Sequence, residues 1–295
     1  MKKSVFEGAA TALVTPFKNG EIDFDTLKNN IEWQIKEGID ALCVCGTTGE
    51  NASMSIFEKE KVIAFSAEVI NKRVPLIAGT GSCNIANSLA LTRFASSNGA
   101  DAVLVVTPYY NKGNGEAIDK SFYTIAEGGG ISLIIYNVPS RTGYDMPVEQ
   151  VLRLSTHPLI CGIKEACGNI DKVQRLTCAL PDDFAVYSGN DSQILPIYSL
   201  GGKGVISVCS NIIPADTAKM CKACKQEKYT EALEIAKRYH TLISLLFAEV
   251  NPAPLKCAMA QLGIDTGELR LPLGDVSEAL YGKLKNELIK LGMLS

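Results

Sequence analysis

The chain has 295 residues, of which 46% are hydrophobic, so it is long enough to bury a large core. Its formal net charge is -3, and lysines and arginines are scattered among the acidic residues. This pattern excludes the basic stripe that nucleic acid or an anionic lipid surface would bind, so we expect small-molecule partners, no nucleic acid and no membrane.

The N-terminal segment, MKKSVFEGAATALVTPF, contains two lysines but only short apolar stretches, which Glu7 and Pro16 interrupt. It resembles neither a secretion signal nor a membrane-spanning helix. We therefore expect a cytoplasmic protein.

Short apolar runs alternate with longer amphipathic segments along the chain, which is the pattern of βα units around a parallel sheet. Eight units can be drawn, and eight units predict an α/β fold of the (β/α)8 TIM barrel type. A doubly wound open sheet would normally show a glycine-rich phosphate turn after its first strand, and ALVTPFKNG does not match that turn. The predicted strands are residues 9–15, 41–45, 75–78, 102–106, 132–136, 159–164, 184–187 and 204–208.

Helical patterns lie between these strands, for example at residues 25–37, 55–70, 85–97 and 147–155. Three more follow the eighth strand, at about residues 229–249, 254–262 and 276–291, which is too much chain for a closing helix alone. We predict a catalytic barrel at residues 1–226 and a C-terminal three-helix region at 227–295. The sequence NPAP at residues 251–254 predicts a stiff corner between the first two tail helices.

Polar groups follow the predicted strands at the end where a parallel barrel builds its active site. They are mainly hydroxyls, with one lysine and one arginine, and they include no histidine. This set suits carbonyl chemistry through an imine better than metal hydrolysis or phosphoryl transfer. Structural roles are also open: the GTTG loop as a helix cap, Tyr136 as a rim aromatic, and Arg141 as a surface partner of Asp145 or Glu149.

Lys164 ends the apolar run PLICGIKEA, where an ammonium group is costly to bury. Its apolar neighbours favour the free amine, which is the form that attacks a carbonyl carbon. Two interpretations fit this segment alone. Lys164 is either a Schiff-base lysine, or a lysine that pairs with Glu165 or reaches solvent along its methylene stem.

The ten cysteines lie mainly inside apolar patterns, which is typical of reduced core residues rather than of a disulfide framework. Cys221 and Cys224 form CKAC, but no second pair or histidine cluster completes a tetrahedral zinc site. The only histidines, His157 and His240, fall in no motif. We therefore predict no metal.

Six motifs together resemble those of the 4-hydroxy-tetrahydrodipicolinate synthase family, formerly called dihydrodipicolinate synthases. This family consists of TIM barrels of the class I aldolase type, and it shares its lysine and tyrosine with N-acetylneuraminate lyase and related pyruvate aldolases. The resemblance covers essentially the whole chain, including EVNPAPLK at 249–256. The motifs are GTTGE at 46–50, TPYYN at 107–111, YNVPSRTG at 136–143, GIKEA at 162–166, SGND at 188–191 and GGKGVISV at 201–208.

The resemblance implies that Lys164 forms a Schiff base with pyruvate. The enamine derived from it attacks L-aspartate 4-semialdehyde, in the diaminopimelate route to lysine. Tyr136 is implied to act as general acid and base, while Thr47 and Tyr110 extend a hydroxyl relay toward water. No cofactor is implied, because the covalent lysine supplies the electron sink.

The same resemblance implies the substrate-binding residues. Thr48 holds the pyruvate carboxylate, Arg141 holds the carboxylate of the semialdehyde, and Gly189 and Ile206 shape the pocket. It also implies a homotetramer, a dimer of dimers in which Tyr110 is shared across the tight dimer.

Two other functions stay open at this point. A sibling pyruvate-dependent aldolase or lyase would act on a sugar acid or sialic acid, and Arg141 argues against it because such enzymes generally lack an arginine there. A non-catalytic regulator built on the barrel is opposed by the intact set of Lys164, Tyr136, Thr47 and Tyr110.

In feedback-inhibited members of the family, lysine occupies a cleft at the dimer interface. This chain keeps the tyrosine of that cleft, Tyr109, but Ile56 and Cys83 offer no partner for an amino acid's charges, and Lys59 repels its ammonium group. We expect weak or absent inhibition by lysine. The residues at the aligned positions other than Tyr109 are Asn51, Ile56, Lys59, Cys83 and Asn87.

Overall fold

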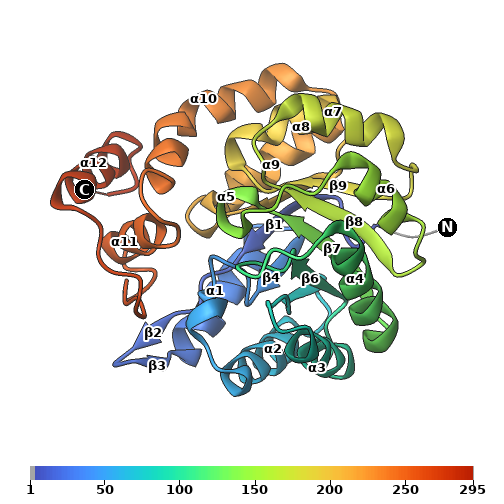
Figure 1. The fold of residues 1–295 in the computed structure, drawn as a ribbon. Helices are drawn as coiled ribbons and strands as arrows, with labels where there is room; N and C mark the ends of the chain where they lie inside the picture. The colour runs from blue at the N-terminus through green and yellow to red at the C-terminus, as the bar shows by residue number, and fades with distance from the viewer. Residues whose placement is uncertain (1–3, 295) are drawn as a thin grey trace.

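The computed structural model describes residues 4–294, in which eight parallel strands close into a barrel surrounded by helices (Figure 1). The predicted (β/α)8 barrel is therefore confirmed. Residues 1–3 and 295, which the predicted ranges 1–226 and 227–295 include, lie outside the described residues. The barrel strands, in order around the barrel, are β1 (Gly8–Ala12), β4 (Ala41–Val44), β5 (Leu76–Gly79), β6 (Ala102–Val106), β7 (Ser132–Asn137), β8 (Ile160–Glu165), β9 (Ala185–Ser188) and β10 (Gly204–Ser207).

The barrel strands are almost entirely buried on both faces, as expected for a parallel sheet covered by helices. Inward-facing side chains, among them Ala10, Cys43 and Ile134, fill the interior. Outward-facing side chains such as Leu42, Val103 and the other apolar groups of the strands pack against the helices. The barrel is thus a packed core, and its chemistry must lie at one end.

The helices around the barrel begin at residues whose side chains cap them. Asp23, Asn84 and Asn114 each accept a hydrogen bond from the backbone N–H three residues later, and Ser55 and Glu58 form a reciprocal capping box. The helices are α1 (Phe24–Lys36), α2 (Ile56–Ile70), α3 (Ile85–Ser97), α4 (Gly115–Gly129), α5 (Pro139–Thr142), α6 (Val148–Ser155), α7 (Ile170–Ala179), α8 (Ile194–Ser199) and α9 (Pro214–Lys225).

Three tail helices follow, α10 (Tyr229–Leu246), α11 (Ala253–Gln261) and α12 (Glu278–Lys290), and Figure 1 shows them at one side of the barrel. Leu242, Leu255 and Leu284 of these helices share one apolar core with Val14 and Val208 of the barrel. The corner before α11 contains a cis Asn251–Pro252 bond. The division at residue 226 stays a prediction, but this shared core explains how the tail can reach the end of the barrel.

The sequence did not predict the hairpin of β2 (Phe17–Lys18) and β3 (Glu21–Ile22) after the first barrel strand. All ten cysteines are free, and Cys221 and Cys224 are buried in α9. Among residues 4–294, every helix is too short or too polar for a bilayer crossing.

Candidate active site

Two side chains face each other at the carboxyl end of the barrel. Lys164 of β8 pairs in register with Tyr136 of β7, and Lys164 Nζ lies 4.5 Å from the centroid of the Tyr136 ring. The residues are 5% and 7% exposed, respectively. The structure therefore brings together the amine and the phenol on which the proposed chemistry depends.

The alternative explanation for Lys164, a pairing with Glu165, is wrong. Successive residues of a strand point to opposite faces, so Glu165 points away from the barrel interior. Its carboxylate lies 3.2 Å from Lys172 Nζ and accepts hydrogen bonds from Asn137. Among residues 4–294, Lys164 forms no ion pair. Its low exposure also argues against the second structural alternative, in which its side chain extends into bulk solvent.

Lys164 and Tyr136 line a cavity of about 350 Å³ at this end of the barrel. Thr47, Thr48, Arg141 and Gly189 line the same cavity, so six of the eight predicted site residues meet there. A second cavity of about 180 Å³ adjoins it and shares Thr47, Tyr136 and Arg141. The remaining lining residues of the first cavity are Val138, Ser140, Ala166, Asn190, Val208, Phe247, Glu249, Val250 and Asn251.

Asn251 was missed by the sequence reasoning. Its side-chain amide donates to Thr48 Oγ1 at 3.1 Å, and its backbone carbonyl oxygen accepts a hydrogen bond from Arg141 at 2.9 Å. It is 7% exposed and comes from the corner between α10 and α11. The tail therefore supports the two side chains that are predicted to bind carboxylates. The resemblance at EVNPAPLK was the signal that could have identified it.

Gly189 and Ile206 occupy different places. A Cβ atom at Gly189 would lie 2.5 Å from the Cβ of Ala166, so only glycine fits at this edge of the cavity. Ile206 is fully buried in the barrel interior, beside Ala10 in the register of β10 and β1. The structure does not bring Ile206 into the lining of the cavity.

The structure does not bring Tyr110 into the lining of either cavity. Its side chain is 90% exposed and its φ angle is 70°, in the left-handed region that a bulky residue adopts at a cost of ~1–3 kcal/mol. The preceding residue, Tyr109, instead lines the second cavity. The role predicted for Tyr110 in the hydroxyl relay therefore stays a prediction.

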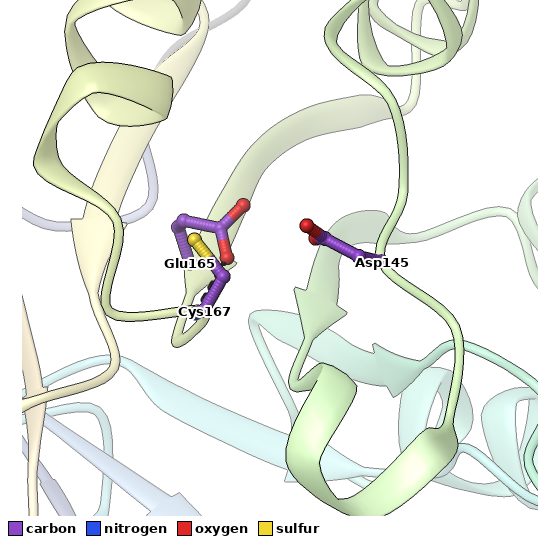
Figure 2. A group of neighbouring side chains, drawn as sticks. All are labelled: Asp145, Glu165 and Cys167. Atoms are coloured by element: carbon purple, nitrogen blue, oxygen red, sulfur yellow. Dashed lines mark hydrogen bonds between the residues drawn. The ribbon is translucent and has the colours of Figure 1, made fainter.

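On the outer side of β7 and β8, Asp145, Glu165 and Cys167 approach one another, and Figure 2 shows the two carboxylates directed toward a common space. Lys172 Nζ binds both carboxylates. Burial alone would lower the pKa of Lys172, but Glu165 and Asp145 outweigh burial and raise it. Burial, helped by Glu165, raises the pKa of the Cys167 thiol to about 11. The group therefore already contains its cation and offers a poor sulfur ligand, so it is an ion-pair cluster rather than a metal site.

The fold and the cavity, with a buried lysine beside a tyrosine, define a lyase of the class I aldolase type. Residues 5–291 match the model of the dihydrodipicolinate synthetase family, and the chain belongs to this family. The resemblance inferred from the motifs is thus confirmed, and the sugar-acid alternative is not favoured.

Relatives match over nearly their full length. The chain is 44% identical over 291 residues to 4-hydroxy-tetrahydrodipicolinate synthase 1 of Clostridium acetobutylicum, covering 99% of each chain. Dihydrodipicolinate synthase from Aquifex aeolicus superposes with a TM-score of 0.96 at 40% identity, covering 98% of this chain and 99% of that one. The chloride-inhibited dihydrodipicolinate synthase from Acinetobacter baumannii, solved in complex with pyruvate, superposes with a TM-score of 0.95 at 39% identity and the same coverage.

Proposed function

We propose that the protein acts as a 4-hydroxy-tetrahydrodipicolinate synthase, which condenses pyruvate with L-aspartate 4-semialdehyde in the diaminopimelate route to lysine. The observation that carries this proposal is Lys164, which is buried, has no ion-pair partner among residues 4–294, and faces Tyr136 in a cavity that Arg141 also lines. The names of the relatives and the pyruvate complex of one of them support the same reaction.

The chemistry begins when the Lys164 amine attacks the keto carbon of pyruvate and the adduct loses water to give an imine. Loss of a proton from the methyl group gives an enamine, whose carbon attacks the aldehyde of the semialdehyde. The amino group of the new chain then attacks the imine carbon, which closes the ring and releases the Lys164 amine. Tyr136, next to the amine, donates and accepts the protons that these steps exchange.

The two carboxylates of the substrates are assigned to two places in the cavity. Thr48, whose hydroxyl group is held by Asn251, binds the carboxylate of pyruvate. Arg141, anchored by one hydrogen bond to the Asn251 carbonyl, presents its remaining donors to the carboxylate of the semialdehyde. Gly189 leaves room at the edge of the cavity, and Ile206 supports it from inside the barrel.

A homotetramer built from tight dimers completes this proposal. Tyr110, exposed and strained in one chain, enters the site of the partner subunit and continues the relay from Thr47. We also assign the protein to the cytoplasm, because ten free cysteines suit a compartment that keeps thiols reduced.

The test is reduction with borohydride in the presence of pyruvate, followed by peptide mapping. We expect a reduced pyruvate adduct on Lys164 and none on the other buried lysines, Lys172 and Lys256, which serve as internal controls. The Lys164→Arg variant should trap no pyruvate. An adduct-free Lys164 peptide from the active wild-type enzyme would contradict the imine mechanism.

The second substrate is tested separately. A coupled assay compares L-aspartate 4-semialdehyde with sugar aldehydes as acceptors for the enamine. We expect turnover with the semialdehyde alone, and preferential turnover of a sugar aldehyde would instead support the sibling aldolase.

A further inference from the structure

We propose that Glu165, together with Asn137 and Lys172, is a positioning cluster that fixes Lys164 and Tyr136 in the arrangement that imine chemistry needs. This inference rests on the proposed function of Lys164. None of the three residues lines the cavity, so they act through the residues beside them in the sequence.

The first step is the register of the two strands. Tyr136 pairs with Lys164 inside the barrel, and the next pair along the same ladder is Asn137 with Glu165. This second pair points outward and is buried, at 0% and 1% exposure. Asn137 Nδ2 lies 2.8 and 3.0 Å from the two oxygens of Glu165. A side-chain link thus joins β7 and β8 one residue beyond the catalytic pair.

The second step concerns the segment that carries Arg141. Asn137 Nδ2 also donates to Asp145 at 2.8 Å, and Asn137 Oδ1 accepts from the backbone N–H of Met146 at 3.1 Å. These contacts close the chain from residue 137 to residue 146 into a loop, and Arg141 lies within it. The Asn137 side chain therefore links the strand pair that carries Lys164 and Tyr136 to the loop that carries Arg141.

The third step is the balance of charge. A buried carboxylate must be paired and hydrogen-bonded to be stable. Glu165 receives Lys172 Nζ at 3.2 Å, the Asn137 amide and the backbone N–H of Cys167 at 2.8 Å. Lys172 in turn binds Asp145 and is fixed in the first turn of α7. A polar network that is satisfied in this way is rigid, and losing one member loosens the others.

Rigidity matters here because the Lys164 amine must approach the keto carbon of pyruvate within a narrow range of distances and angles. Small displacements of reacting groups from that geometry lower the rate by large factors. A positioning role therefore predicts a loss in the chemical step. A merely structural brace predicts a loss of stability alone, with unchanged chemistry in the molecules that stay folded.

The experiment compares Glu165→Gln with a matched control, Asp119→Asn. Asp119 is also a buried carboxylate with an amide and a cationic partner, since it accepts from Gln150 at 2.6 Å and from Arg153 at 3.1 Å, and it lines no part of the cavity. For each variant we measure the melting temperature, kcat and KM for pyruvate, and the rate at which cyanoborohydride traps pyruvate on Lys164. All assays are run well below the melting temperature.

We expect Glu165→Gln to lower kcat and the trapping rate by about tenfold or more, with a smaller change in KM, whereas Asp119→Asn changes only the melting temperature. Asn137→Ala removes the link from the other strand and should show the same loss, so it replaces Glu165→Gln if that variant does not fold. Trapping and kcat within about twofold of wild type in a folded variant would overturn the positioning role. If the wild-type enzyme itself traps no pyruvate, the proposed function fails instead.

Discussion

Lys256 Nζ lies 2.6 Å from a carboxylate oxygen of Glu50, and both side chains are fully buried. This pair joins helix α11 of the tail to the loop that follows β4. Burial lowers the pKa of Lys256, although Glu50 opposes that effect. Lys256 also donates to the carbonyl oxygen of Glu268 at 2.8 Å. Because Glu50 follows Thr47 and Thr48 within the GTTGE motif, the ion pair couples the tail to the predicted substrate-binding loop.

Replacing Lys256 with methionine should leave the Glu50 carboxylate buried without its cation. We expect the free energy of unfolding to fall by ~3–5 kcal/mol, which is the usual cost of breaking a buried pair from one side. Urea denaturation measures the change. The control is Glu32→Gln, which breaks the exposed pair with Arg73 and should cost less than about 1 kcal/mol. Similar losses in the two variants would show that burial adds nothing.

Acid sensitivity should depend partly on Glu58. A hydrogen bond from Arg270 is the main cause that lowers the pKa of Glu58 from 4.5 to about 2. A carboxylate whose pKa is lowered by folding stabilises the protein above its unfolded value, and this contribution is lost as the pH falls from 4.5 toward 2.

We therefore expect Glu58→Gln to lower the urea midpoint at about pH 7 and to change it little at about pH 2. The wild-type midpoint should consequently fall more steeply with acid than that of the variant. Parallel curves over this range would contradict the assignment.

The barrel itself was predictable from the sequence because its signals are local. The runs that became β6 and α3 were assigned with the right bounds, since a β-branched stretch and an Asn84 cap define them within a few residues. The β2–β3 hairpin was missed because its strands have only two residues each, too few to show an alternation of apolar and polar residues. Asn19-Gly20 was the available signal, and both residues have positive φ as a tight hairpin turn requires.

The site was predictable only in part, for a different reason. Lys164, Tyr136 and Arg141 stand at strand ends in recognisable motifs. Asn251 contacts Thr48 across 203 residues of sequence, and no local pattern reports such a contact. From the sequence, a pairing of Lys164 with Glu165 was left open, although strand alternation places neighbouring residues on opposite faces and was a signal against it. The actual partner of Glu165, Lys172, depends on how α7 packs.

Substitution of Arg141 by lysine should separate the two substrates. A lysine keeps the charge but loses the planar, two-donor fork, so the semialdehyde carboxylate is held by fewer hydrogen bonds. We expect KM for the semialdehyde to rise by ~10–100-fold, equivalent to about 1.4–2.8 kcal/mol, with KM for pyruvate nearly unchanged. Steady-state kinetics with each substrate varied in turn gives both values. Equal changes in the two constants would show that Arg141 supports the whole cavity instead.

Lysine should inhibit the enzyme weakly or not at all. Lys59 and Ile56 lie on α2 where a lysine ligand would need polar or acidic partners, and Cys83 contacts Tyr109 rather than offering a charge. At about 1 mM lysine we expect the rate to stay within about twofold of the uninhibited value. Calorimetric titration with lysine checks binding independently of activity. A steep inhibition curve at micromolar lysine would contradict this prediction.

Sharing of Tyr110 between subunits predicts complementation between two defective chains. Lys164→Ala removes the amine and Tyr110→Phe removes the donated hydroxyl group, so each variant alone should be inactive or strongly impaired. In a mixed dimer, the site of the Tyr110→Phe chain keeps its own Lys164 and receives the wild-type Tyr110 of the partner.

That site is complete, while the second site of the mixed dimer lacks both groups. Random co-assembly should restore about a quarter of the wild-type sites, because half of the dimers are mixed and each has one complete site. Differently tagged, co-expressed chains are assayed as the random population and, after purification of the mixed dimer, as that species alone, in which about half of the wild-type kcat per chain is expected. Sedimentation establishes the assembly. If Tyr110 acted within its own chain, both sites of a mixed dimer would be defective. The exposure of the Tyr110 ring and its strained backbone would then need another explanation.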